Sequence, residues 1–248
     1  MSVDPHPITV WHGSIRALAS HAKEVVDGAE WAYASSLKYP RHRATVLASR
    51  AGFRRVVAQY VAVSPQHLQV TRVCGTCQRP HGPPKLPHAG YPALWTSVSH
   101  SGDCLLIAVS TLGPIGVDVE VVRARRTIAA TAARCFTPSE LAAWEEEPLK
   151  DRERTFYQYW TGKEAAFKLY GLVSHPRDIE VTLSRCGAAY ARAPDGHDCW
   201  PLLSLAVGSV NVAHLCVPKQ KHYEALLQTK FTAGAAGTTM SPLPIPVC

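Results

Sequence analysis

Apolar residues recur along this chain at two spacings, one typical of helices and the other of strands. Residues 41–61 and 152–170 place apolar side chains every three or four positions, which predicts two long amphipathic helices. A shorter helix is expected over about residues 17–26. Short apolar runs bounded by turn residues predict strands instead. These expected strands cover residues 8–11, 95–100, 104–110, 115–120, 179–183, 188–191, 202–206 and 211–217.

Residues with strong local preferences mark the ends of several elements. Thr137, Pro138 and Glu140 combine an N-cap hydroxyl, a proline suited to the first helical turn and a glutamate three positions after the cap. A helix should therefore begin there. Gly171 should end the second long helix. The strands and tight turns within residues 95–120 are expected to form one compact β unit.

The order of the expected elements favours an α+β fold. Each half of the chain carries helices followed by strands, without a strict strand–helix alternation. We expect an N-terminal lobe over residues 1–112 and a C-terminal lobe over residues 113–227, similarly built but diverged in sequence. Residues 228–248 are rich in Gly, Ala, Thr and Pro, which predicts a disordered tail.

Composition and charge limit the class of protein. Of the 248 residues, 46% are hydrophobic and 18% are charged, as in an ordinary folded protein. No apolar run reaches the roughly 18 residues of a membrane helix, and residues 1–12 lack the pattern of a signal peptide. We therefore expect a cytoplasmic chain with no membrane partner. The net charge of +7 favours anionic partners, but no block of Lys or Arg resembles a nucleic-acid-binding arm.

Two acidic residues stand two positions apart in the segment 116–120. On a strand, Asp118 and Glu120 point to the same face, whereas the neighbouring valines point to the other. Two adjacent carboxylates repel each other unless a cation lies between them, and oxygen ligands suit Mg²⁺. The alternative interpretation is a solvent-facing acidic edge of an amphipathic strand.

Polar side chains in two further segments are candidates for chemistry. Glu164 and Lys168 lie four positions apart and share one face of a helix, as a functional pair or as an ordinary surface ion pair. Ser99 and His100 end a strand that enters the turn at Gly102. A hydroxyl, an imidazole and backbone N–H groups can bind phosphate there. The alternative at this turn is a capping histidine.

Together these segments resemble the 4′-phosphopantetheinyl transferase family, in particular its broad-specificity, surfactin-synthetase-activating type. That family has a Ser-His-Ser strand end, then Gly-(Ile/Val)-Asp-(Ile/Val)-Glu, then Trp-x-x-Lys-Glu-(Ala/Ser)-x-x-Lys about forty residues later. Here these motifs are residues 99–101, 116–120 and 160–168. Residues 136–140 resemble the family's Phe-(Ser/Thr)-x-x-Glu. The resemblance extends over about residues 40–217.

The resemblance implies an enzyme that moves the phosphopantetheine arm of coenzyme A onto a serine of an acyl or peptidyl carrier protein and releases 3′,5′-ADP. It also implies two similar lobes related by a pseudo-twofold axis, with the active site in the cleft between them. Asp118, Glu120 and Glu164 would hold Mg²⁺, with Mn²⁺ as the alternative, and Glu164 would accept the proton of the serine. Lys163 and Lys168 would offset phosphate charge. The implied catalytic residues are Asp118, Glu164 and Lys168.

The same resemblance implies contacts for coenzyme A. Ser99 and His100 match the family's phosphate contacts, and Arg43 matches the basic residue at the start of its long helix, near the nucleotide 3′-phosphate. Residues 81–87 resemble the family's Tyr-Gly-Lys-Pro-x-(Ile/Leu)-Pro loop near the adenine. The implied contacts in that loop are His81, Gly82, Pro84 and Lys85. One departure is Pro83, which stands where a lysine is common.

Two other functions stay open. A zinc-containing binding protein would draw its ligands from Cys74, Cys77, His81 and His88, but no second pair of cysteines or histidines follows. We therefore expect no stoichiometric zinc in the purified chain. A catalytically weak relative that binds coenzyme A is the other alternative, although the acidic and lysine positions of the motifs are intact. For the transferase, the resemblance implies small acidic carrier proteins as partners and a monomeric enzyme.

Overall fold

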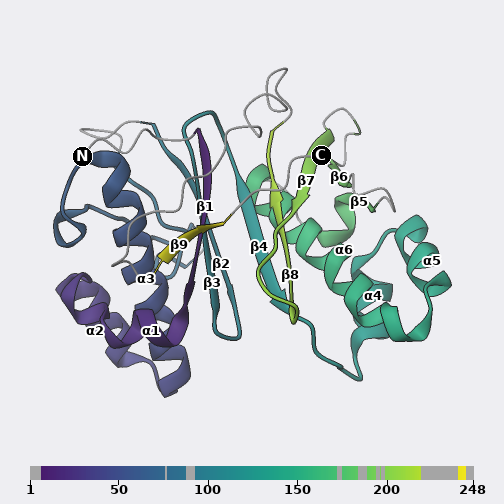
Figure 1. The fold of residues 1–248 in the computed structure, drawn as a ribbon, viewed down its shortest axis with the longest axis horizontal. Helices are drawn as coiled ribbons and strands as arrows, with labels where there is room; N and C mark the ends of the chain where they lie inside the picture. The colour runs from purple at the N-terminus through teal and green to yellow at the C-terminus, as the bar shows by residue number, and fades with distance from the viewer. Residues whose placement is uncertain are drawn as a thin grey trace. The chain divides into compact units, whose positions relative to one another are not determined.

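The chain forms two compact units of mixed helix and sheet (Figure 1). The structure, a computed structural model, describes residues 7–75, 77–87, 93–171, 175–183, 189–193, 196, 199–218 and 240–243. Unit 1 contains the described residues up to Gly113 together with a strand near the C-terminus. Unit 2 contains the described residues from Pro114 to residue 218. This confirms the coarse prediction of an α+β fold.

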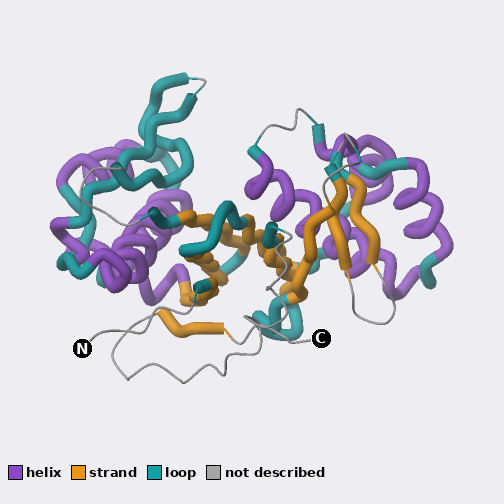
Figure 2. Tube along the Cα trace, turned by 90° about the horizontal axis from the view of Figure 1, so that it is seen from above, coloured by secondary structure: helices purple, strands orange, loops and turns teal. Residues whose placement is uncertain are grey.

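Unit 1 is a four-stranded antiparallel sheet covered on one face by helices, as Figures 1 and 2 both show. The strand order is β2-β3-β1-β9. The strands are β1 (Ile8–Ser14), β2 (Trp95–Ser101), β3 (Cys104–Ser110) and β9 (Met240–Leu243). The helices are α1 (Ile15–Ser20), α2 (Gly28–Ser36) and α3 (Pro40–Val61), with short 3₁₀ turns at Ala22–Glu24 and Pro65–His67.

The core of unit 1 lies between α3 and the central strand β3. From Leu105 to Ser110, the side chains of β3 are all buried, and α3 packs against this strand. Phe53 and Val56 of α3 are fully buried and belong to the same cluster as Leu105 and Ile107. Burying apolar side chains of this size stabilises the fold by roughly 1.5–3 kcal/mol each.

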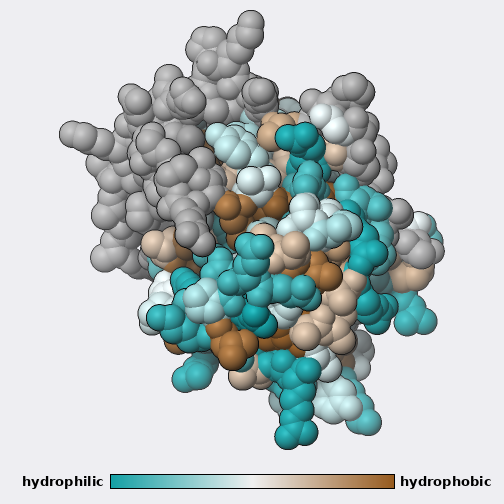
Figure 3. Space-filling model, turned by 90° about the vertical axis from the view of Figure 1, so that its right-hand side faces the viewer, coloured by the Kyte–Doolittle hydropathy of each residue, from teal (hydrophilic) through white to brown (hydrophobic). Residues whose placement is uncertain are grey.

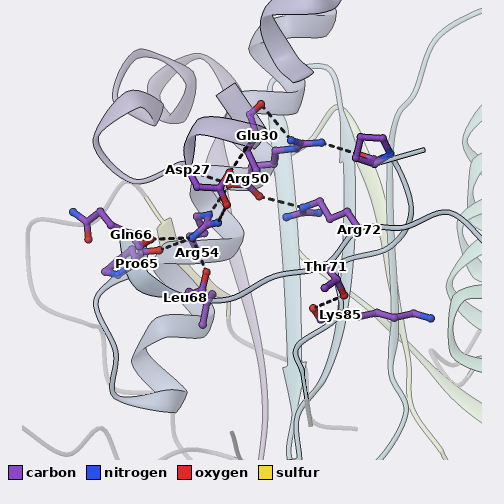
Figure 4. Close-up of polar contacts among 11 residues, drawn as sticks. Asp27, Glu30, Arg50, Arg54, Pro65, Gln66, Leu68, Thr71, Arg72 and Lys85 are labelled. Atoms are coloured by element: carbon purple, nitrogen blue, oxygen red, sulfur yellow. Dashed lines mark hydrogen bonds and ion pairs between the residues drawn. The ribbon is translucent and has the colours of Figure 1, made fainter. Parts of the chain in front are cut away.

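Helix α2 is tied to α3 by a charge network around a buried arginine (Figure 4). Arg54, 1% exposed, donates from Nε to Glu30 at 2.6 Å and pairs through Nη2 with Asp27. Its Nη1 donates to the carbonyl oxygen of Leu68 at 2.8 Å. Asp27 and Glu30 also form the capping box of α2. Because the network satisfies a buried guanidinium on several sides, it fixes α2 and the chain after α3 against the same point.

Unit 2 is a five-stranded antiparallel sheet with three helices. The strand order is β4-β8-β7-β6-β5. The strands are β4 (Gly116–Val121), β5 (Glu180–Leu183), β6 (Ala189–Arg192), β7 (Cys199–Ser204) and β8 (Asn211–Cys216). The helices are α4 (Ile128–Cys135), α5 (Pro138–Glu146) and α6 (Leu149–Tyr170), with a 3₁₀ turn at Pro176–Asp178. Helix α6 lies along β4 and β8 and ends at Gly171 in the left-handed conformation, with φ of 72°.

Aromatic side chains fill the core of unit 2. Phe136 is 1% exposed, stacks on Phe156 with ring centroids 5.5 Å apart, and meets Trp144 and Tyr159 at 6.4 and 5.1 Å.

On the face seen in Figure 3, hydrophilic residues are interspersed with smaller hydrophobic areas. Among the helices of the described chain, none has both the length and the apolar content needed to cross a membrane.

Two expectations from the sequence differ from the structure. Residues 95–120 do not form one β unit, because β2 and β3 pair with each other in unit 1 whereas β4 pairs with β8 in unit 2. A disordered tail was expected over residues 228–248. Strand β9 (Met240–Leu243) lies in that range and pairs with β1, so the prediction is wrong for these four residues. The rest of that range lies outside the described residues.

Candidate functional site

Strand β4 begins at Gly116, where helix α6 crosses it. A side-chain carbon at Gly116 would lie 1.8 Å from the carbonyl oxygen of Ala165 and 2.9 Å from the backbone nitrogen of Leu169. No residue with a side chain fits at this spacing, so the glycine allows the helix to lie directly on the strand. Asp118 then faces α6, because alternate residues of a strand share one face.

Lys168 of α6 forms an ion pair with Asp118 beside this crossing. Its Nζ donates to Oδ1 of Asp118 at 2.7 Å and to the carbonyl oxygen of Val117 at 3.0 Å. The side chains of Asp118 and Lys168 are 8% and 28% exposed. The pair is therefore largely shielded from water, unlike the surface ion pair with Glu164 that helical spacing alone allows. The structure thus brings together two of the predicted catalytic residues.

Glu164 belongs to the same charged cluster. Burial raises the pKa of Glu164, the negative charges of Asp118 and Glu120 raise it further, and the positive charge of Lys168 lowers it. The carboxylates of Asp118, Glu120 and Glu164 are therefore close enough to influence one another in partly buried surroundings. With all four groups ionised, three carboxylates and one ammonium leave an excess of negative charge.

The cluster fits a hard divalent cation by its donor chemistry. All three acidic side chains offer oxygen ligands, and their excess negative charge favours a cation. Among the described residues, one group of three potential metal ligands has its ligand atoms within 4.8 Å of one another, and it is Cys74, Cys77 and His81. The three acidic side chains of the cluster do not form such a group. Lys168 serves as the cationic partner of Asp118 in the structure.

Lys163 projects into the interior of unit 2 instead. It is 1% exposed, and its Nζ pairs with Glu140 at 2.7 Å and donates to the carbonyl oxygens of Pro176, at 3.2 Å, and Ile179. These acceptors use all three N–H donors of the ammonium group. The structure is therefore at odds with the phosphate contact predicted for Lys163. Adjacent helical residues project about 100° apart, which separates Lys163 from Glu164.

His214 is a buried neighbour of the site that the motifs do not include. It stands opposite Asp118 in the pairing of β4 with β8. Its Nδ1 lies 2.8 Å from Oγ1 of Thr161, and its Nε2 lies 3.2 Å from Oγ of Ser204. Burial lowers the pKa of His214 to about 4, so the imidazole is neutral at physiological pH. We interpret it as a polar link that fixes α6 on the sheet. A lone histidine within an apolar strand was its only signal in the sequence.

Unit 1 contains a cavity of about 250 Å³ next to the loop at residues 80–84. Four of the residues predicted to contact coenzyme A line it, and they come from this loop and from the end of β2. They are His81, Gly82, Pro84 and His100. Three further lining residues can bind a ligand and were not predicted from the sequence, namely Tyr33, Arg50 and Arg72.

The two missed arginines give this cavity a positive character (Figure 4). Arg50 lies over the ring of Tyr33 at 4.5 Å and donates from Nη2 to the carbonyl oxygen of Pro80 at 2.8 Å. Arg72 donates from Nε to Glu30 at 3.4 Å. Burial lowers the pKa of Arg72 to about 10, which still leaves it charged at neutral pH. No local motif marks either arginine, because their neighbours come from distant parts of the sequence.

The other predicted nucleotide contacts are not among the residues named as lining this cavity. Arg43 is exposed in the first turn of α3, and its Nη2 donates to the carbonyl oxygens of Leu37 at 3.2 Å and Ser35 at 3.4 Å. Lys85 is exposed and forms an isolated β-bridge with Thr71. Ser99 is 7% exposed within β2.

A group of potential soft-metal ligands stands in the loop that leads to the cavity. Cys74, Cys77 and His81 converge as described above, and Sγ of Cys77 lies 2.8 Å from Nε2 of His81. His88, the fourth ligand considered from the sequence, lies outside the described residues.

Several proteins similar to this chain carry the name of one enzymatic family. Over 183 residues it is 31% identical to slr0495 of Synechocystis sp., whose name assigns it provisionally to the 4′-phosphopantetheinyl transferases, and the match covers 74% of this chain and 72% of that protein. HetI of Nostoc sp., named a 4′-phosphopantetheinyl transferase, is 28% identical over 202 residues, which cover 78% of this chain and 81% of HetI.

One solved structure shows a weaker likeness. The crystal structure of Thermotoga maritima holo-[acyl-carrier-protein] synthase covers 53% of this chain and 82% of that chain, with a TM-score of 0.36 and 18% identity. This likeness is too low to support an argument about the fold.

A family-model match covers the segment that carries the acidic cluster. Residues 114–216 match the model of the 4′-phosphopantetheinyl transferase superfamily, and this segment contains Asp118, Glu120, Glu164 and Lys168. The match, the identity to slr0495 over most of both chains, and the motifs agree. This chain belongs to the 4′-phosphopantetheinyl transferase superfamily.

Proposed function

We propose that the cluster on β4 and α6 performs the reaction of the family to which the chain belongs. That reaction transfers the 4′-phosphopantetheine group of coenzyme A to a serine hydroxyl of a carrier protein. A bond forms between the serine oxygen and the β-phosphorus, the bond from that phosphorus to the bridging oxygen breaks, and 3′,5′-ADP leaves. The observation that carries the residue assignment is the ion pair of Lys168 with Asp118 at 2.7 Å, made where α6 lies directly on β4.

Asp118, Glu120 and Glu164 are the residues that would hold the divalent cation on which this family typically depends. We propose Mg²⁺, with Mn²⁺ as the alternative, because all the ligands are oxygens. When bound, the cation supplies charge neutralisation at the pyrophosphate of coenzyme A. The chain contributes rigid placement, since Asp118 lies on a paired strand and Glu164 on a helix that packs directly on it.

Glu164 is the proposed acceptor of the serine proton. A carboxylate accepts a proton more readily when its pKa is raised towards the working pH. In the metal-free chain, burial and the neighbouring Asp118 both raise the pKa of Glu164. The proton passes from the serine hydroxyl to the Glu164 carboxylate, directly or through one water molecule.

Lys168 is the proposed cationic partner of the transferred phosphate. Its ammonium group is held by Asp118 and the carbonyl oxygen of Val117, yet 28% of its side chain stays exposed. One N–H donor therefore remains for a phosphate oxygen. Charge-assisted hydrogen bonds of this kind favour the transition state of phosphoryl-type transfer.

The cavity in unit 1 is the proposed site of the nucleotide end of coenzyme A. It is lined by His81, by Arg50, Arg72 and His100, whose side chains suit phosphate groups, and by the ring of Tyr33, which suits a base. Arg43, Lys85 and Ser99 remain proposed contacts on the basis of the motifs. The proposal includes two similar lobes with a pseudo-twofold relation and an active site in the cleft between them.

The finer properties of the enzyme follow the same resemblance. We propose a monomeric, cytoplasmic transferase of the broad-specificity type, acting on small acidic carrier proteins. The net charge of +7 supports an acidic partner, because a basic surface attracts one at long range. Coenzyme A, itself anionic, is the second substrate.

The direct test is incubation of the purified chain with Mg²⁺, coenzyme A and an apo carrier protein, followed by mass spectrometry of the carrier. We expect the carrier to gain the mass of one phosphopantetheine group. Asp118→Ala should reduce turnover by at least about a hundredfold, because the charge stabilisation supplied by a bound metal is worth several kcal/mol. Asp151→Ala, which removes an exposed acidic residue from the first turn of α6, is the matched control and should leave turnover unchanged.

The alternatives give different results in the same assay. A catalytically weak relative would bind coenzyme A without modifying the carrier. Near-normal turnover of Asp118→Ala, in a folded protein, would contradict the proposed metal site.

A further inference from the structure

Three side chains with zinc-binding groups converge in a loop of unit 1. The Sγ atoms of Cys74 and Cys77 and a ring nitrogen of His81 all lie within 4.8 Å of one another. In tetrahedral zinc sites, Zn–S distances of about 2.3 Å and Zn–N distances of about 2.0 Å separate the ligand atoms by roughly 3.5 Å. The Cys77 Sγ–His81 Nε2 distance of 2.8 Å is shorter than this spacing, so small side-chain rotations are needed to admit one zinc ion.

We propose that Cys74, Cys77 and His81 bind one Zn²⁺ ion, with water as the fourth ligand. Two thiolates and an imidazole are typical zinc ligands, whereas a hard cation such as Mg²⁺ prefers oxygen ligands. Both cysteines are thiols in the structure. This proposal replaces the expectation that the chain holds no zinc, which rested on the lack of a second ligand pair. The fold supplies the third ligand from His81, which follows Cys77 by four residues.

The backbone of the loop is already shaped to present both thiols together. The carbonyl oxygen of Cys74 accepts from the N–H of Gln78 at 3.0 Å, and the N–H of Cys74 donates to the carbonyl oxygen of Arg79 at 2.9 Å. Gln78 adopts the left-handed conformation, with φ of 60°, which is uncommon for a residue with a side chain. The chain thus turns back on itself between the second thiol and the histidine.

This turn lies on the surface, where few apolar contacts can hold it. Residues 77–81 are all exposed. An unfavourable backbone conformation persists only where surrounding interactions fix it. A zinc ion would supply such a fixed point, because it joins residues from both arms of the turn.

The loop connects this cluster to the cavity. The N–H of Gly82 donates to the carbonyl oxygen of Arg72 at 2.8 Å, and the carbonyl oxygen of Pro80 accepts from Arg50. A side-chain carbon at Gly82 would lie 2.6 Å from the carbonyl oxygen of Val73, so the two arms of the loop are in close contact. His81 lies between Pro80, which accepts from Arg50, and Gly82, which donates to Arg72. Zinc bound to His81 would therefore fix this wall of the cavity.

The first test measures zinc in the full-length chain. The protein is purified under reducing conditions, stripped with a chelator selective for zinc, refilled with Zn²⁺ and analysed for its elements after removal of the unbound metal. We expect about one zinc per chain, and a visible absorption spectrum typical of tetrahedral thiolate ligation when Co²⁺ replaces it. Cys74→Ser/Cys77→Ser should lose both signals.

Cys104→Ser is the matched control for that test. Burial raises the pKa of the Cys104 thiol to about 11, so it is a poor metal ligand at neutral pH. This variant should keep its zinc. Zinc retained by the double variant, or absent from the refilled wild type with reduced thiols, would overturn the proposal. A disulfide between Cys74 and Cys77 in the purified chain that reforms in preference to zinc binding would overturn it as well.

The second test concerns the cavity and rests on the proposed function. Removing zinc, with Mg²⁺ held saturating, should raise KM for coenzyme A several-fold and change kcat much less, because the ion holds a binding wall and not the reacting groups. Zinc stoichiometry is read without any substrate, so the metal site can fail while transferase activity stands. The reverse is equally distinguishable: zinc can be present in a chain that transfers nothing. A KM for coenzyme A unaffected by zinc would separate the metal site from the cavity.

Discussion

Lys163 and Lys168 lie five positions apart on helix α6 and pair with carboxylates in different surroundings. Lys168 reaches Asp118 on β4 at 2.7 Å and keeps part of its side chain in solvent. Lys163 reaches Glu140 of α5 at 2.7 Å, and both side chains are almost completely buried. Five helical positions correspond to a rotation of roughly 140°. One lysine therefore belongs to the candidate site and the other to the core.

For Lys168, we expect Lys168→Ala to slow phosphopantetheine transfer by at least about tenfold, as loss of a charge-assisted contact made in the transition state does. The melting temperature should change by only a few degrees, since the ammonium group is partly solvated. Lys150→Ala, at an exposed position of the same helix, is the control for both measurements. Unchanged turnover with a lowered melting temperature would make Lys168 a purely structural residue.

For Lys163, we expect a large loss of stability and little change in turnover, the opposite of Lys168. Lys163→Met leaves the carboxylate of Glu140 buried without its ammonium partner, and breaking a buried pair in this way costs about 3–5 kcal/mol. Denaturant unfolding should show this loss, whereas kcat per folded molecule should stay within about twofold of the wild type. A variant with normal stability and strongly reduced turnover would restore the phosphate role predicted from the motif.

The sequence predicted the elements whose signals are local. Strand β3 lies at its predicted residues because its apolar run is bounded by turns on both sides. The left-handed glycine at Gly171 ends α6 as expected. The sequence did not predict which strands pair, because the alternation of β4 indicates its buried face but not whether the neighbouring strand is β3 or β8. Helix α2 was missed although its capping box, Asp27 and Glu30, was visible in the sequence.

Gly116 tests whether the helix crossing fixes the site. Gly116→Ala places a methyl group 1.8 Å from a backbone oxygen that cannot move without shifting α6, so we expect at least about 3 kcal/mol of destabilisation. Gly162→Ala is the control, because the added carbon would meet only side-chain atoms of Leu202 and Val181, at 3.2–3.4 Å. Its loss should stay within about 1 kcal/mol, since alanine also favours the helix. Equal losses in the two variants would contradict the close crossing.

Glu164 should destabilise the metal-free protein at neutral pH. Its folded-state pKa is raised, chiefly by burial and then by Asp118, so folding favours the protonated form more than the unfolded chain does. The stability contributed by this proton is fully present below the unfolded pKa of about 4.3 and is lost as pH rises through the folded value. We therefore expect Glu164→Gln to melt at a higher temperature than the wild type at pH 7 without Mg²⁺. The difference should shrink as the pH falls towards 4.

Activity and metal separate this effect from a general gain in packing. Glu164→Gln should lose most of its turnover, because the amide can neither accept the proton nor bind a cation as a carboxylate does. Adding Mg²⁺ should raise the melting temperature of the wild type more than that of the variant. If Glu164→Gln melts below the wild type at pH 7 without metal, then burial and the neighbouring carboxylates do not destabilise the ionised Glu164 in the folded state.

The sequence predicted which residues of the candidate site lie near one another where their spacing on one element decided it. Lys168 pairs with Asp118, and Glu164 belongs to the same charged cluster, because a strand and a helix each present motif residues towards the other. Lys163 was misplaced because helical periodicity does not say which side of α6 the core occupies. Arg50 and Arg72 were missed because they meet at the cavity only through the fold, as their contacts with Glu30 and Pro80 show.

Carrier recognition should depend on salt, because the chain has a net charge of +7 and its proposed carriers are acidic. Rim charges mainly set the rate of association, and salt at a few tenths molar shortens the Debye length to well under about 8 Å. The apparent KM for the carrier should therefore rise strongly between low ionic strength and about 0.3 M, with a smaller change in kcat. Mg²⁺ is held saturating in both conditions.

Coenzyme A is anionic as well, so its KM must be measured in the same buffers. Its proposed contacts at Arg50 and Arg72 are largely buried, and buried charge pairs are screened much less than exposed ones. Salt should therefore raise KM for coenzyme A less than KM for the carrier. A carrier KM that stays flat across this range would mean that apolar contacts dominate recognition. A larger rise for coenzyme A would instead place the salt-sensitive charges at the nucleotide.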